Sequence, residues 1–211
     1  MRKIKCIFLV AVGSFLWASC NSKTADKATE VSKVTTEVSA NKTEISEEDY
    51  KEGKWLEQLP EKKPLTLGQL EASVPKSLNG MPLIKVVDDS KNGRAGIKAV
   101  YSNTDNPSKE AIHINFFITD GAGEEGYKHL KSTFNMLKFP IHTNDGVKIS
   151  KIEDWNNKRL ATNQRLVKDK WISHTEFIQN QRFHLKIEGQ NLKAEQLSEA
   201  LNTISQLSFP E

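Results

Sequence analysis

The stretch WISHTEFIQNQRFHLKI, residues 171–187, decides the fold class because it has the pattern of a β-hairpin. Two runs that alternate apolar and polar residues flank Gln179-Asn180-Gln181. A three-residue loop at these positions pairs Ile178 with Arg182 and places Glu176 opposite His184. Since side chains alternate between the two faces of a strand, this register gathers large apolar residues on one face: Trp171, Phe177, Phe183, Leu185 and Ile187.

The opposite face of this hairpin is polar and holds the first candidate site. His174 and His184 lie diagonally, with Glu176 beside both, so the three side chains could bind a ligand or a metal ion such as zinc. Arg182 and Lys186 share this face and would repel a cation. The alternative is a polar sheet face that is solvated or covered by a helix.

The same reasoning extends along the chain from residue 66. Turn residues separate seven predicted strands, at 83–87, 96–102, 110–119, 147–152, 159–167, 171–178 and 182–187. Helices are predicted from Thr66 to Pro75, around 127–137, and after Asn191 as the cap of a last helix with a continuous apolar stripe. Strands joined by short turns pair antiparallel. The sequence therefore predicts an α+β domain, an antiparallel sheet of about six or seven strands with helices packed on it as an α/β/α sandwich.

Two runs of strands, each closed by a helix, give this order of elements a known counterpart. It is similar to the arrangement in PsbP-like and Mog1-like domains, which also occur in bacterial lipoproteins. That resemblance is architectural and implies the sandwich fold. It does not imply one activity, because the fold hosts several unrelated roles.

The N-terminus has the pattern of a secretory signal. Arg2, Lys3 and Lys5 precede an apolar run over 7–16, and small residues precede Cys20. This segment resembles the lipobox of bacterial lipoproteins, which implies cleavage before Cys20 and acylation of that cysteine. An ordinary signal peptide, cut near residue 18, is the alternative. The predicted organisation is a signal peptide over 1–19, a lipidated cysteine and disordered tether over 20–54, and one globular domain over 55–211.

Charge and composition limit the partners of the mature chain. The formal net charge of +3 falls to about zero when the three basic residues of the signal are removed, so there is no electrostatic case for nucleic acid. Residues 21–54 are rich in Ser, Thr, Lys and Glu, which is typical of a disordered spacer with a reach of roughly 30 to 35 Å. Membrane attachment must then come from the lipid.

A second candidate site is the loop Gly121-Ala-Gly123-Glu-Glu-Gly126, which spells GxGxxG after a strand and before a helix. Such a loop can bring backbone amides to a pyrophosphate. The preceding strands form hairpins, however, and two glutamates lie where the phosphates would bind. Turn formation explains the glycines, and acidic residues stabilise the start of a helix. We expect no cofactor.

The sequence contains no motif for nucleophilic catalysis, and we expect no catalytic residue. It predicts a non-catalytic binding domain whose partner is another envelope protein, a cell-wall component or a small ligand. Asn21 after the lipidated cysteine favours, by the same resemblance, the outer membrane and its periplasmic side. The alternative function is an envelope hydrolase or metal-binding protein that uses His174, Glu176 and His184.

Overall fold

A nine-stranded antiparallel sheet forms the centre of the domain in the computed structural model, which describes residues 51–108 and 110–210. The strands are β1 (Ser77–Leu78), β2 (Met81–Asp88), β3 (Gly96–Tyr101), β4 (His113–Asp120), β5 (Ile141–Asn144), β6 (Lys148–Trp155), β7 (Lys158–Val167), β8 (Lys170–Gln179) and β9 (Phe183–Gln190). The predicted α+β class is confirmed. The predicted number of six or seven strands is too low, because the short edge strands β1 and β5 were not expected.

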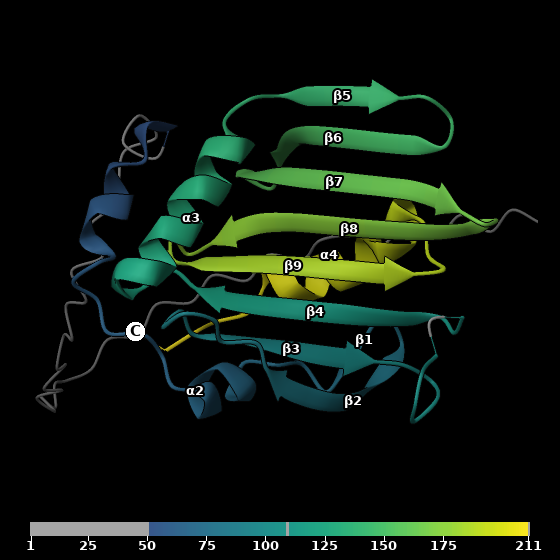
Figure 1. Cartoon of the computed structure of the whole chain (residues 1–211), viewed down its shortest axis with the longest axis horizontal. Helices are drawn as coiled ribbons and strands as arrows, with labels where there is room; N and C mark the ends of the chain where they lie inside the picture. Colours follow the sequence, from purple (N-terminus) through teal and green to yellow (C-terminus); the bar gives the residue numbers. More distant parts are fainter. Residues whose placement is uncertain (1–50, 109, 211) are drawn as a thin grey trace, which may run out of the picture. The chain divides into compact units, whose positions relative to one another are not determined.

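The sheet order is β1-β2-β3-β4-β9-β8-β7-β6-β5, so two series of hairpins meet where β4 pairs with β9 (Figure 1). The longer connection between the two series carries helix α3 (Gly123–Leu137), which leads from the central β4 to the edge strand β5. The hairpin β8–β9 therefore occupies the middle of the sheet, next to β4.

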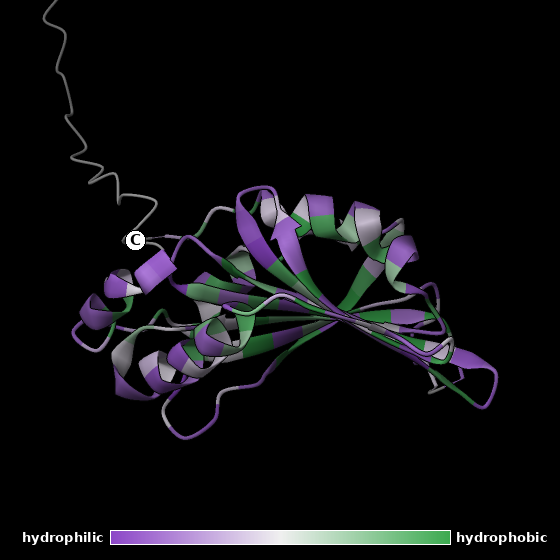
Figure 2. Cartoon of the chain, turned by 90° about the horizontal axis from the view of Figure 1, so that it is seen from above, coloured by the Kyte–Doolittle hydropathy of each residue, from purple (hydrophilic) through white to green (hydrophobic). Residues whose placement is uncertain are grey.

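Helices lie on both sides of the sheet (Figures 1 and 2). The α4 face packs against α2 (Leu67–Ala72), the 3-10 turn η2 (Ala194–Leu197) and α4 (Ser198–Ser205). The α3 face packs against α3 and the 3-10 turn η1 (Lys54–Gln58). The two faces of the sheet are named after these two helices.

Each face has its own hydrophobic core. The larger core lies on the α4 face and includes Tyr101, Phe116, Phe177, Leu185 and Ile187, all fully buried. A smaller core lies on the α3 face, between the helices and one end of the strands. It consists of Trp55, Leu56, Leu59, Leu130, Phe134, Leu137, Ile152, Ala161 and Ile178.

The central hairpin has the predicted faces but a different register. Gln179 pairs with Phe183 and Ile178 with His184, so the loop is displaced by one residue from the predicted one. Asn180 and Gln181 both have positive φ, at 50° and 54°, which makes the turn tight. Because each strand shifts by one residue, the partners change but every side chain keeps its face.

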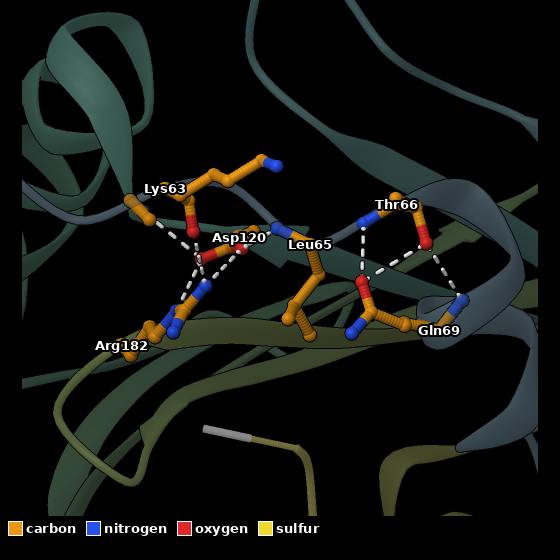
Figure 3. A network of polar contacts seen from close by, with 7 residues as sticks. Lys63, Leu65, Thr66, Gln69, Asp120 and Arg182 are labelled. Carbon is orange, nitrogen blue, oxygen red and sulfur yellow. Dashed lines mark hydrogen bonds and ion pairs between the residues drawn. The ribbon is translucent and has the colours of Figure 1, made fainter.

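Capping residues in the sequence predict two helix starts. Thr66 caps α2, and its side chain and that of Gln69 form a reciprocal capping box (Figure 3). The predicted cap at Asn191 is wrong, since Lys193 is the N-cap of η2. Asn191 instead has φ 58° and its Nδ2 donates to the carbonyl of Glu110 at 2.7 Å, which ties the end of β9 to the loop before β4.

A buried ion pair joins three distant parts of the chain. Asp120, at the end of β4, accepts bonds of 2.8 Å from Nε and Nη2 of Arg182 in the β8–β9 turn (Figure 3). It also accepts from the backbone N–H of Leu65 at 2.8 Å, and Arg182 donates to the carbonyl of Lys63 at 3.0 Å. The pair thereby holds the segment before α2 against the centre of the sheet.

The N-terminal predictions fall mainly outside the described residues. The signal peptide over 1–19, Cys20 and most of the tether lie there. Within the described part, Gly53 is buried and η1 begins at Lys54, so folded structure extends to the N-terminal side of Trp55. No helix in that part is long and apolar enough to cross a membrane.

Candidate functional site

The α3 face is covered at one end only. Helix α3 lies across the ends of β7, β8 and β9, and no described helix crosses the remainder of this face (Figure 1). The strand register places one row of side chains on this face next to the helix: Lys98, Phe117, Lys186 and Glu176, on β3, β4, β9 and β8. The candidate site consists of this uncovered area and of His129, which α3 contributes next to it.

A hydrogen-bonded chain of three side chains lies where α3 meets the sheet, and we call it the histidine chain. Nε2 of His184 on β9 lies 2.8 Å from Oε2 of Glu176 on β8. Nδ1 of His184 lies 3.0 Å from Nε2 of His129, which α3 contributes. Because the carboxylate can only accept, Nε2 of His184 carries a proton. The predicted pair Glu176 and His184 is therefore in direct contact, and a helix supplies its third member.

Burial and neighbouring charges determine the protonation of this chain. Burial lowers the pKa of His129 to about 4, with further lowering by the positive charges of His184 and Arg94. Burial alone would raise the pKa of Glu176, but the hydrogen bond from His184 and the nearby positive groups outweigh it and hold that pKa below its usual range. At neutral pH the chain thus has an ionised carboxylate at one end and a neutral imidazole at the other.

His174, the third predicted residue, shares the face but stands apart from the histidine chain. It pairs with Glu188 on β9 and with Asn163 on β7, and burial lowers its pKa. Across 51–108 and 110–210, no group of three or more His, Cys, Asp or Glu side chains is arranged to hold a metal ion. The structure therefore brings together two of the three predicted residues, as a hydrogen-bonded pair.

A phenylalanine between two lysines occupies the uncovered area, and we call these three residues the Phe117 patch. Nζ of Lys186 lies 4.5 Å from the centroid of the Phe117 ring, and Nζ of Lys98, from the strand on the other side of β4, lies 5.6 Å from it. All three side chains are partly exposed. Cations at this range are attracted by the ring face, so the lysines fix the ring and surround it with positive charge.

A small hollow adjoins the Phe117 patch at the edge of the sheet, and we call it the Lys85 hollow. It has a volume of about 230 Å³ and is lined by Lys85, Lys98, Val100, Asn106, Pro107, His113 and Asn115. Two lysines and no carboxylate line it, so it is electropositive. Nδ1 of His113 lies 3.0 Å from the carbonyl of Ala111, which fixes the proton on that nitrogen and leaves Nε2 for a ligand.

A broader hollow of about 1300 Å³ lies at the other end of the domain, between the end of α3 and the β6–β7 turn. Trp155 and Arg159 are among its lining residues, and Nη1 of Arg159 is held by Asp154 at 2.9 Å. The ring of Trp155 lies 5.7 Å from that of Phe177, so this side chain packs on the core. Neither hollow contains His174, Glu176 or His184.

The glycines of the loop before α3 have a packing role. A Cβ on Gly121 would lie 2.5 Å from Leu130, and one on Gly126 would lie 2.6 Å from the carbonyl of Asp120. Two of the loop amides are also occupied, since the N–H of Gly121 donates to the carbonyl of Arg182 and the N–H of Gly123 donates to the carbonyl of Leu59. Close packing therefore accounts for Gly121 and Gly126, and a positive φ of 74° accounts for Gly123, without a bound phosphate.

Sequence reasoning found the polar face of the hairpin but missed three parts of the site. His129 was not placed because it lies on a helix 55 residues before His184. Phe117 and Lys98 lie on strands whose register with β9 was not predicted. The alternation of residues along β4 did contain a signal for Phe117, because it places Phe117 on the face of the sheet opposite to the core residue Phe116.

No family model, no curated protein and no solved structure matches this chain. The geometry of the site is therefore the basis for assigning a function to the domain.

Proposed function

We propose that the chain is a lipid-anchored protein of the bacterial envelope whose globular domain is a non-catalytic binding module for an acidic glycan. The binding surface is the uncovered area of the α3 face. The ring of Phe117 stacks on a sugar ring, and the lysines around it pair with anionic groups of the glycan. The observation that carries the proposal is the partly exposed Phe117 ring between two ammonium groups, at 4.5 Å and 5.6 Å from its centroid.

The chemistry of this surface supports a ligand that has both a ring face and negative charge. An aromatic side chain offers a flat apolar surface, while lysines offer mobile charges that adapt to different anions. Lys186 also pairs with Glu188 at 2.8 Å, which limits the excess of positive charge next to the ring. A flat, partly polar surface of this kind suits an extended polymer better than a small molecule, which needs a concave site.

The geometry of the histidine chain supports binding over hydrolysis. A catalytic chain of this type activates a nucleophile held within hydrogen-bond distance of an imidazole. Within the described part of the protein, no side-chain hydroxyl is hydrogen-bonded to the ring of His129 or His184. The histidine chain also lies outside the Lys85 hollow and outside the broader hollow near Trp155. Its contacts instead link helix α3 to strands β8 and β9.

The anchor is proposed from the N-terminal sequence. A near-neutral mature chain needs a lipid for stable membrane attachment, and Cys20 follows a lipobox-like segment. The resemblance to PsbP-like and Mog1-like domains stays a prediction, and the binding proposal does not depend on it. Cys20→Ser should move the protein from the membrane to the soluble fraction of the envelope. Unchanged partition would exclude lipid attachment at this cysteine.

Binding is tested by cosedimentation of the purified chain with isolated peptidoglycan, an insoluble glycan that carries carboxylates. Phe117→Ala should weaken cosedimentation by tenfold or more, because stacking and the fixed positions of both lysines are lost. Phe139→Ala is the matched control, since this phenylalanine is 69% exposed but lies outside the Phe117 patch. Equal binding by both variants and the unmodified chain would refute the proposed surface.

A further inference from the structure

The Lys85 hollow has features that the Phe117 patch does not require. It is a concave space formed by β2, β3, β4 and the loop before β4, and strand residues supply its floor. Val100 is 5% exposed and Asn115 is 7% exposed, so two neighbouring positions on the sheet form a rigid base. The volume of about 230 Å³ lies below the range of about 300 to 1,000 Å³ that is typical of whole-ligand sites. The hollow therefore suits one chemical group of a larger ligand.

The lining of the Lys85 hollow selects for negative charge. Lys85 and Lys98 enter from neighbouring strands, and within the described ranges neither of them pairs with a carboxylate. The side-chain NH2 group of Asn115 can donate hydrogen bonds to either neutral or anionic oxygens of a ligand. An anion in the hollow would thus meet two ammonium groups and at least one amide, with no acidic residue in the lining.

The proton on His113 narrows the class of anion. Nδ1 of the ring donates to the carbonyl of Ala111, so Nε2 is an acceptor whenever the ring carries a single proton. An acceptor next to two ammonium groups suits an anion that also carries an acidic O–H. Monohydrogen phosphate has both negative charge and an O–H that can donate. Acetate and sulfate at neutral pH have only acceptor oxygens.

We infer that the Lys85 hollow binds a phosphate group, held by Lys85, Lys98 and Asn115 and donating its O–H to Nε2 of His113. This inference rests on the proposed function, since it names the phosphate of a phosphorylated sugar, bound in its singly protonated form, as the group that enters the hollow when the sugar ring stacks on Phe117. Lys98 belongs to both the hollow and the patch and links them. A free phosphate ion presents the same group without the sugar.

The test is a titration of the full chain with inorganic phosphate, followed by amide chemical shifts. Saturable shifts should centre on Lys85, Lys98 and Asn115, and acetate and sulfate should bind at least tenfold more weakly. Lys85→Gln removes one ammonium from an exposed strand position and should weaken phosphate binding by tenfold or more. Lys148→Gln is the control, because it removes the same charge from β6 on the same face of the sheet and should leave phosphate binding unchanged.

Absence of saturable shifts with phosphate in the millimolar range would overturn the inference. Equal weakening by Lys85→Gln and Lys148→Gln would also overturn it, because the effect would then be one of general surface charge. Neither result bears on the Phe117 patch, which peptidoglycan cosedimentation tests with Phe117→Ala. If Phe117→Ala leaves cosedimentation with peptidoglycan unchanged while phosphate still binds, the proposed glycan surface is refuted. The Lys85 hollow would then remain as a phosphate site.

Discussion

The ion pair between Asp120 and Arg182 is predicted to be the most sensitive polar contact in the fold. The Asp120 side chain is fully buried, and its two oxygens accept four hydrogen bonds. The donors are Nε and Nη2 of Arg182, the backbone N–H of Leu65 and the backbone N–H of Ala122, at 2.8 to 2.9 Å. Asp120→Asn keeps the size of the side chain but replaces one acceptor oxygen by an NH2 group that faces two donors. It also leaves the guanidinium buried without its counter-charge.

Breaking a buried pair by removal of one partner costs about 3 to 5 kcal/mol, and we expect this loss for Asp120→Asn. At about 2 to 4 °C per kcal/mol for a domain of this size, the melting temperature should fall by roughly 6 to 20 °C. Denaturant-induced unfolding, followed by tryptophan fluorescence, measures the free energy directly. Amide exchange at Leu65 should also accelerate, because its acceptor is lost.

A matched control separates the effect of breaking a buried ion pair from the effect of removing one negative charge. Asp154 forms a similar 2.9 Å contact with Arg159, but its side chain is 87% exposed. Asp154→Asn should change the unfolding free energy by no more than about 1 kcal/mol, as is usual for surface pairs. A loss below about 1 kcal/mol for Asp120→Asn, or equal losses in both variants, would refute the role assigned to the buried pair.

Two further predictions concern α3 and its loop. The pKa of His129 is about 4 in the folded state and about 6.5 when unfolded, so the unfolded chain takes up the proton first and stability falls as pH drops from 6.5 to 4. The loss should be on the order of 2 to 3 kcal/mol, and His129→Gln should remove this contribution from stability curves measured across that range; an unchanged curve would contradict it. Gly126→Ala should destabilise by about 1 to 3 kcal/mol, because its Cβ would lie 2.6 Å from a backbone carbonyl. Gly68→Ala is the contrast, since nothing lies within 4 Å of that Cβ in helix α2, and thermal melts should show a small gain.

The parts of the fold that the sequence predicts are those with strong local patterns. Seven strands were predicted from alternation and turn residues, and α2 was predicted from its capping box. Strand β5 was missed because all four of its residues are exposed and carry no alternation of burial. It is a strand only because it pairs with β6, which is a property of the tertiary structure.

Contacts between distant segments explain what sequence reasoning missed in the site. Alternation along β8 and β9 was enough to place Glu176 and His184 on one face. It could not reveal His129, because the contact depends on where α3 crosses the sheet. The buried pair was missed for the same reason, since Asp120 and Arg182 are 62 residues apart, one at the end of β4 and the other in the turn after β8.

The size of the sheet explains why part of the α3 face is left for binding. The strands β7, β8 and β9 have 8 to 10 residues and are roughly 26 to 33 Å long, whereas α3 lies across them and one helix with its side chains is about 10 to 12 Å wide. Helix α3 therefore covers only the end where its core residues lie, and solvent requires polar side chains elsewhere on this face. Lys98 and Lys186 meet that requirement. Phe117 does not, and a partly exposed aromatic ring held between two lysines is more readily explained by a ligand than by the solvation of the sheet.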